Sequence, residues 1–355
     1  MKRVLLTSLA IAAAAVGAFF LGRQGADAPK DTSAIPSTAA SAQQRADLQT
    51  SDPVRRHAEF GNFLTQLTAD EAAARAHEIW SAAGEPQEIA ERKRLFCYAW
   101  GQVAGSAAIE FARKQPGVGK VAAISGALAG WASKDPLAAK QWIEARLEPN
   151  ERLLHGWALV DGWARHDPKA ATDYVLGLTN IPGTDRFIRS IALEMTRQSG
   201  PAASEWAEAL PQGPLRETGI DEVAASWART APGFATNWAF ALTDSPLATR
   251  AVDRAVTEWA RVDGEAAGAY LEGQPASSVR DAAVSAYIAV LAAEDLHAVS
   301  AWAATIRDSN LREQSLRRIA GEWMARNVEA TLAWLPQSGL SAEAQRQIGA
   351  AEQTR

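Results

Sequence analysis

Cysteine, methionine and tyrosine are scarce in this chain, with one, three and four copies among 355 residues. The single cysteine, Cys97, excludes an internal disulfide, so the fold must be held by packing alone. A reactive thiol needs a nearby base and an electropositive setting, and the sequence offers neither. We therefore expect Cys97 to be a buried thiol in a helix core.

Motifs for catalysis, metals and cofactors are also missing. The histidines show neither HxxxH nor HExxH spacing, and GxSxG, Walker A and dinucleotide-binding patterns are absent. The five histidines are His57, His77, His155, His166 and His297. We interpret them as structural or surface residues, and we predict no catalytic, metal-binding or cofactor-binding residues.

The sequence also lacks clusters of positively charged residues. The formal net charge is −5, and there is no run of basic residues that could neutralise phosphates. Lys2, Arg3 and Arg23 lie in the N-terminal segment. Without their three positive charges, the formal net charge of the rest of the chain is −5 − 3 = −8. The composition therefore argues against a nucleic-acid partner.

Residues 1–23 are predicted to be a membrane-targeting helix. Lys2 and Arg3 precede an uncharged run, Val4–Gly22, of about the length that spans a membrane. The small-x-small site at Ala26–Ala28 is followed by proline, so we favour a retained single-pass anchor over a signal peptide cleaved in the periplasm. With the positive end in the cytoplasm, the rest of the chain is exported in either case.

Aromatic residues recur at a fixed interval through most of the remaining chain. A first column is spaced by 31 residues once and then by 32 throughout: Trp100, Trp131, Trp163, Met195, Trp227, Trp259, Leu291 and Trp323. A second column follows eleven residues after the first: Phe111, Trp142, Tyr174, Trp206, Trp238, Tyr270, Trp302 and Trp334. A period of this length is typical of stacked helical repeats, so we predict eight copies of a 32-residue unit.

Between the two columns lies a signal for a new helix. Four residues after the first column most copies carry a side chain that caps a helix N-terminus: Asp135, Asp167, Ser199, Asp263, Asp295 and Asn327, with alanine at Ala104 and Ala231. Proline follows at Pro136, Pro168 and Pro232, as expected at a first helical position. Paired small residues come next, such as Ala138 and Ala139, and allow close helix contacts.

The first helix of each copy shows the spacing of an amphipathic helix. Leu316, Ile319, Ala320 and Trp323 follow the i, i+3, i+4, i+7 pattern. The fold class is therefore predicted to be all-α, an α-solenoid of about eight antiparallel helix pairs.

The layout resembles the tetratricopeptide-like class of helical repeats, which also place aromatic and small residues at helix contacts. The resemblance covers about residues 57–340 and is one of architecture, because the unit here has 32 residues and a WAxxDPxAAxxW string replaces that family's consensus. The resemblance implies partner binding.

The pattern predicts five segments. Residues 1–23 are the targeting helix, and residues 24–56, rich in Ala, Ser, Thr, Pro and Gln, are a flexible linker. Residues 57–99 hold N-terminal capping helices and the opening helix of the first copy. Residues 100–340 form the repeat array, and residues 341–355 a polar C-terminal tail or capping helix.

Four arginines stand two residues after the first column in consecutive copies: Arg165, Arg197, Arg229 and Arg261. In one interpretation they complement the helix dipole and cover apolar surface with their stems. In the other they form a track that binds an acidic peptide or polysaccharide. The aromatic columns present a similar choice between core and carbohydrate platform, and their place beside the small residues favours core.

The function expected from these features is a non-enzymatic protein-interaction scaffold on the exported side of a bacterial membrane. An unidentified protein or peptide is the expected partner, and the membrane is contacted through the N-terminal segment only. The alternatives are a structural subunit of an envelope complex and an envelope enzyme whose site the sequence does not reveal.

Overall fold

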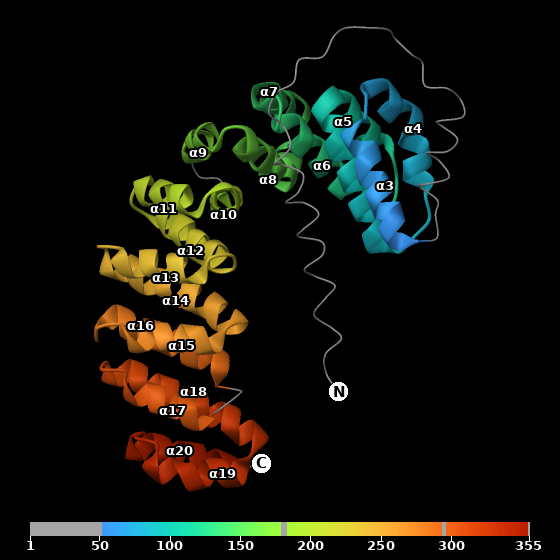
Figure 1. Ribbon diagram of the computed structural model, residues 1–355. Coiled ribbons are helices and arrows are strands. Elements are labelled where there is room, and N and C mark those ends of the chain that lie inside the picture. Colours follow the sequence, from blue (N-terminus) through green and yellow to red (C-terminus); the bar gives the residue numbers. More distant parts are fainter. Residues whose placement is uncertain (1–51, 179–182, 293–295, 354–355) are drawn as a thin grey trace. The chain divides into compact units, whose positions relative to one another are not determined.

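A computed structural model describes residues 52–178, 183–292 and 296–353, and within them all regular structure is helical (Figure 1). The predicted all-α class is therefore confirmed for the described part of the chain. That part divides into two units, one ending at Phe63 and the other beginning at Leu64. The predicted targeting helix, residues 1–23, lies outside the described residues. No helix within them is long and apolar enough to cross a membrane.

The predicted end of the linker at residue 56 is wrong, because helix α3 (Pro53–Thr65) begins inside it. The Asp52 carboxylate accepts a hydrogen bond from the Val54 amide at 2.9 Å, and Pro53 occupies the first helical position. Both features stabilise a helix start without any large apolar side chain, which is why apolar content alone places this boundary too late.

Helices occupy most of the second unit. The N-terminal ones are α4 (Ala69–Ser81), α5 (Pro86–Lys114), α6 (Lys120–Ala132), α7 (Pro136–Arg146), α8 (Pro149–His166), α9 (Pro168–Leu176), α10 (Thr184–Gln198) and α11 (Gly200–Ala209). The C-terminal ones are α12 (Pro214–Ala228), α13 (Pro232–Ala241), α14 (Ser245–Val262), α15 (Gly264–Glu272), α16 (Ser278–Leu291), α17 (Leu296–Ala304), α18 (Ser309–Arg326), α19 (Val328–Trp334), the 3-10 turn η1 (Leu335–Gln337) and α20 (Ala342–Gln353).

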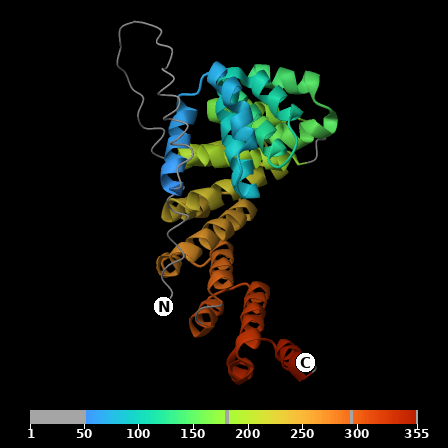
Figure 2. The same cartoon turned by 90° about the vertical axis from the view of Figure 1, so that its right-hand side faces the viewer.

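From α6 to α19 the helices alternate between two roles. The even-numbered helices, from α6 to α18, each contact the next even-numbered helix along the chain. Each odd-numbered helix, from α7 to α19, packs on the even-numbered helix before it. Figure 2 shows the helices from α11 onward following one another in chain order.

The predicted capping residues are confirmed where the structure describes them. The side chains of Asp135, Asp167, Ser199, Asp263 and Asn327 each accept a hydrogen bond from the backbone N–H three residues later. Asp295 lies outside the described residues. Ala231 has no capping side chain, yet its backbone, with φ −144° and ψ 67°, has the extended conformation of the other cap positions.

The first copy differs, because α5 runs through the position where a break is predicted. Ala104 keeps φ −154° and ψ 67°, close to the values at Ala231, so α5 is kinked there. Without a capping side chain or a proline, the turn between two helices is reduced to this single residue.

The two aromatic columns pack against each other within a copy. Ring centroids are 5.3 Å apart for Trp100 and Phe111, and 5.2 Å apart for Trp259 and Tyr270. Their members in the described residues are buried or half-buried, and Leu316, Ile319 and Ala320 are buried as predicted. The core interpretation of the columns is confirmed by this packing, because stacked and covered rings do not form an open carbohydrate platform.

Consecutive copies meet at the residue after the cap. A Cβ on Gly105 would overlap the Trp131 ring, and one on Gly200 would overlap the Trp227 ring. Leu291, the first-column residue of a later copy, similarly contacts Gly264. The first-column side chain of each of these copies therefore rests on the start of the second helix of the copy before it.

Helices α5 and α6 approach so closely that only glycine fits between their backbones. A Cβ on Gly130 would overlap the Tyr98 carbonyl oxygen, and one on Gly126 would overlap the Arg94 carbonyl oxygen. The two helices therefore form a closely packed pair.

At the other end, the predicted C-terminal cap is helix α20. Ser341 precedes α20 and donates its backbone N–H and its hydroxyl to the Glu313 carboxylate of α18. These hydrogen bonds lower the pKa of Glu313.

Candidate functional site

The four arginines of the predicted ladder lie near the C-terminal ends of α8, α10, α12 and α14. Each is paired with a carboxylate of the described chain. The nitrogen–oxygen distances are 3.0 Å for Arg165–Asp161, 2.8 Å for Arg197–Glu194, 4.0 Å for Arg229–Glu222 and 3.0 Å for Arg261–Glu258. An acidic ligand would have to compete with these internal partners.

Two members of the ladder are brought together by one buried carboxylate. Glu194 accepts a hydrogen bond from Arg197 and lies 4.0 Å from the Arg165 guanidinium. Asp161 binds Arg165 and also accepts a hydrogen bond from the Ser190 hydroxyl at 3.2 Å. These contacts tie α8 to α10, so this part of the ladder has a structural task.

The sequence contained a signal for this pairing that the ladder interpretation did not use. In three of the four cases the acidic residue stands three or four positions before the arginine, at Asp161, Glu194 and Glu258. Side chains at this spacing are neighbours on a helix surface. The anion-track hypothesis stays a prediction, now with a known competitor at each arginine.

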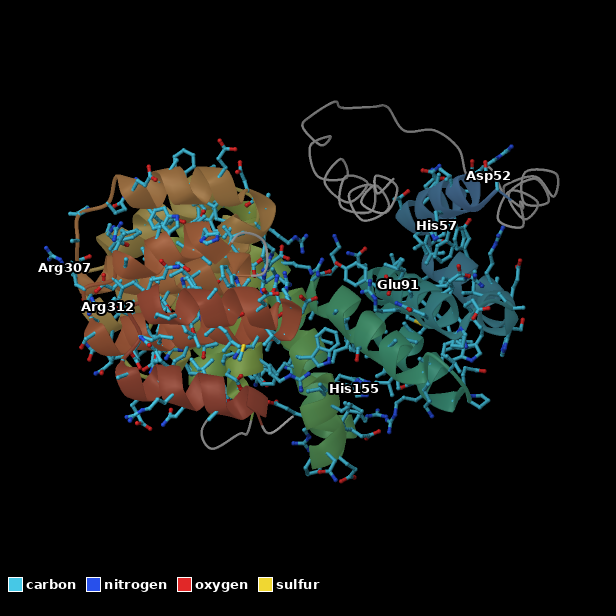
Figure 3. All side chains as sticks on the ribbon, turned by 90° about the horizontal axis from the view of Figure 1, so that it is seen from below. Asp52, His57, Glu91, His155, Arg307 and Arg312 are labelled. Carbon is cyan, nitrogen blue, oxygen red and sulfur yellow. The ribbon has the colours of Figure 1, made fainter. Side chains whose placement is uncertain are left out.

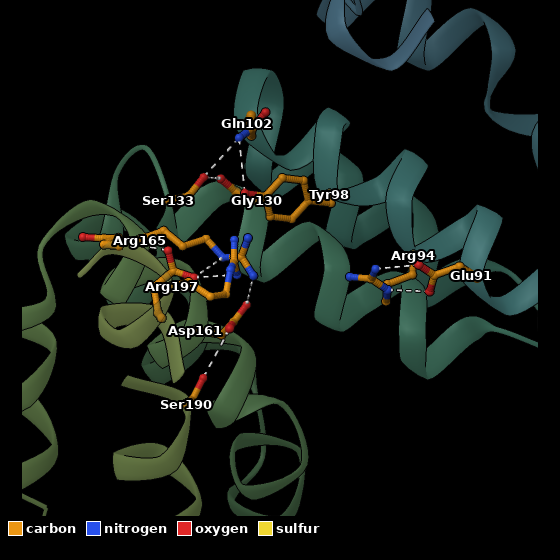
Figure 4. Close-up of polar contacts among 12 residues, drawn as sticks. Glu91, Arg94, Tyr98, Gln102, Gly130, Ser133, Asp161, Arg165, Ser190 and Arg197 are labelled. Atoms are coloured by element: carbon orange, nitrogen blue, oxygen red, sulfur yellow. Dashed lines mark hydrogen bonds and ion pairs between the residues drawn. The ribbon is translucent and has the colours of Figure 1, made fainter. Parts of the chain in front are cut away.

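A hollow of about 510 Å³ lies beside this cluster, between α5, α6, α8 and α10. Its charged lining is basic: Arg94 from α5, Lys120 from α6 and Arg186 from α10. Arg94 is held by Glu91 through two hydrogen bonds of 2.7 and 2.6 Å (Figure 4). Within the described residues the side chains of Lys120 and Arg186 have neither a hydrogen bond nor an ion pair. The remaining lining is Ala90, Gly117, Gly119, Val121, Ala122, Ser125, Leu154 and Trp157.

Ser125 and His155 form a pair that the sequence analysis missed. The Ser125 Oγ lies 2.9 Å from the His155 Nδ1, and the contact joins α6 to α8. Figure 3 labels His155 on its helix. The exposed fractions of Ser125 and His155 are only 2% and 3%, and burial lowers the pKa of His155. A serine beside a histidine could act as a nucleophile, but this serine, although it borders the hollow, is almost fully covered by its neighbours.

The thiol of Cys97 is fully buried in α5, as predicted. Burial raises its pKa to about 12, so the thiol is protonated and unreactive at neutral pH. In the described parts of the chain, no three His, Cys, Asp or Glu side chains are grouped so as to hold a metal ion. The predictions of no metal, no cofactor and no catalytic residue remain predictions.

Comparison with protein-family models, with curated proteins and with solved structures finds no match to this chain. The similarity to tetratricopeptide-like repeats therefore stays a resemblance of layout. The function has to be inferred from the residues of the chain itself.

Proposed function

We propose that the chain is an α-solenoid of eight 32-residue helix pairs and serves as a non-enzymatic protein-interaction scaffold on the exported side of a bacterial membrane. In this proposal residues 1–23 anchor the chain and the linker holds the repeats away from the bilayer. The observation that carries the proposal is the recurrence of one cap conformation at 32-residue spacing while consecutive even-numbered helices stay in contact. Such stacking generates a long continuous surface, which is the usual binding element of helical repeat proteins.

The contrast between inner and outer positions supports a binding role. Four residues after the cap, every described copy from the second onward has a buried and mostly small residue: Ala139, Ala171, Ala203, Ala235, Ala267, Val299 and Thr331. Two residues after the cap, the same copies carry exposed or half-exposed residues of unlike chemistry: Leu137, Lys169, Pro201, Gly233, Glu265, His297 and Glu329. A constant interior with a varied exterior suits a scaffold whose copies each contribute a different contact.

The two alternatives have less support. The enzyme alternative gains little from the two candidate reacting groups of the described chain, because Ser125 and Cys97 are both buried. A structural subunit would use the same binding surface as a scaffold. The two roles differ in how long the complex with the partner lasts. A scaffold releases its partner on dilution, whereas a subunit is purified together with it at fixed stoichiometry.

Site-specific photo-cross-linking in the chain's own membrane fraction tests the proposal. A photoreactive residue replaces Leu137, Phe234 or Val262 in turn, because these large apolar side chains are among the most exposed. We expect a discrete adduct with one other protein from at least one position, lost when purified unmodified chain is added in excess. If every position gave only self-adducts or none, the scaffold proposal would be wrong.

A further inference from the structure

The thirteen tryptophans of the chain do not all have a place in the repeat. Only Trp80 and Trp157 stand outside the two columns. Trp80 has a structural role, because its indole N–H donates to the Pro116 carbonyl at 3.2 Å and its ring lies 4.2 Å from the buried Lys93 ammonium. Trp157 has no comparable partner among the described contacts and lines the hollow.

The position of Trp157 in the repeat makes the residue unusual. It stands six residues before the first column, where the other copies from the second to the eighth carry Ser125, Arg189, Asp221, Asp253, Ser285 and Arg317. All the remaining copies from the second to the eighth therefore carry a polar residue at this position, and the fold does not require an aromatic ring there. A large half-buried ring at a polar position, on the wall of a hollow, indicates a contact with something outside the fold.

The charged side chains of the hollow are positive, whereas the chain as a whole is negatively charged. The chain has a formal net charge of −5, yet Arg94, Lys120 and Arg186 line the hollow and no carboxylate of the described residues does. Glu91 offsets Arg94, so the unpaired charge comes from Lys120 and Arg186. A carboxylate entering here would find two cations that have no competing carboxylate among the described residues, in contrast to the arginine ladder.

The walls of the hollow are apolar. Leu154 and Val121 are each about half exposed there, next to Trp157. Two unpaired cations beside an aromatic and two aliphatic side chains match a ligand that carries a carboxylate next to an apolar group. We propose that this hollow binds a peptide segment in which an aspartate or glutamate lies beside a large apolar side chain. The inference rests on the proposed scaffold function and names the site and the chemistry of its partner.

A peptide fits this lining better than a carbohydrate does. Sugar hydroxyls need many acceptors, and among the described lining residues Ser125 is the only uncharged side chain that offers one, already paired with His155. Aliphatic walls instead complement leucine or phenylalanine side chains. A peptide of alternating acidic and apolar residues presents both groups to the hollow at once.

The test uses fluorescence anisotropy of the full-length chain with a labelled peptide that alternates glutamate and phenylalanine. We expect saturable binding that weakens as salt is raised, because the attraction is partly electrostatic. Two matched peptides, with serine in place of phenylalanine or lysine in place of glutamate, should each bind about tenfold more weakly or worse.

Variants locate the binding in the hollow. Lys120→Glu with Arg186→Glu should weaken binding about tenfold or more, as should Trp157→Ser, since serine occupies the same position in two other copies. The matched control is Lys169→Glu with Arg346→Glu, which makes the same change in net charge at exposed residues of α9 and α20. Thermal melting checks that each variant is folded.

The outcomes separate the inference from the proposed function. Binding that is lost in the hollow variants and kept in the control supports the inference. Binding that is unchanged in the hollow variants, or equally weak in the control, overturns it, while cross-linked adducts would leave the scaffold function standing. Displacement of the peptide by an acidic polysaccharide at a lower concentration than by unlabelled peptide also overturns it. The absence of both peptide binding and adducts refutes the inference and the scaffold function together.

Discussion

The missing cap at Ala231 offers a sharp test of the repeat. Its backbone already has the conformation of the capped copies, and Pro232 already occupies the first helical position. Ala231→Asp should therefore supply the one absent hydrogen bond, from the backbone N–H of Phe234 to the new carboxylate. The reciprocal change, Asp263→Ala, should remove the bond of 2.9 Å that the Ala266 N–H donates in α15.

The magnitude follows from measured capping energies. Gain or loss of a capping side chain changes stability by about 1 kcal/mol, with a range of about 0.5 to 2 kcal/mol. Unfolding a unit of roughly 290 residues carries about 0.6 kcal/mol of free energy per degree, so the shift in Tm is only about 1.5–2 °C. Local opening is the more sensitive quantity, because 1 kcal/mol slows exchange about fivefold if the amide exchanges through opening of α13 alone.

Hydrogen exchange resolved by mass spectrometry is therefore the assay. Ala231→Asp should slow exchange in α13, and Asp263→Ala should speed exchange in α15. The control is Ala231→Glu, which carries the same charge near the helix dipole but is a poorer cap. If aspartate and glutamate protect α13 equally, the gain is electrostatic; if aspartate gives no protection, the cap conformation has been misread.

Three further predictions concern the core, the helix contact and the pH dependence. Trp323→Ala should lower the free energy of unfolding in urea by about 3–5 kcal/mol, because the ring is buried in the core; a loss below 1 kcal/mol would contradict this. Gly130→Val should cut the soluble yield or the Tm strongly, since its side chain would overlap the Tyr98 carbonyl, whereas Gly349→Ala, with open space around it, should not. Since the folded chain lowers the pKa of His155 below 6.5, the unfolded chain binds the proton more readily, and stability should fall as the pH drops below about 6.5. His155→Gln should flatten that part of the pH profile; an unchanged profile would assign the acid sensitivity to other groups.

Local chemistry explains why so much of the fold could be predicted. A cap such as Asp167 and the proline after it lie beside the amides that they affect, so neighbouring residues in the sequence are enough to predict the helix start. The buried positions Ile319 and Ala320 follow in the same way from spacing along one helix. At Ala104 the predicted break is only a kink within α5, since nothing next to that alanine shows whether a helix ends or only bends there.

The candidate site could not be predicted in this way. Lys120 and Arg186 are far apart in the sequence and share a hollow only because α6, α8 and α10 pack side by side. Neither residue belongs to a repeating column that would have drawn attention to it. Trp157 was the exception, because an aromatic residue in an otherwise polar column can be recognised from the sequence once the columns are aligned.

The contact between a first-column side chain and the glycine of the preceding copy has a consequence for the length of the protein. Because Trp227 packs on Gly200, and Leu291 on Gly264, these copies are positioned by the copy before them rather than by a common centre. Removal of one whole copy would join equivalent surfaces, so that a first-column side chain would again pack on the start of the helix before it. Removal of half a copy would set a second helix where a first helix belongs. In the proposed solenoid the chain can be lengthened or shortened only in whole copies, so the spacing between surface features of different copies changes in fixed steps.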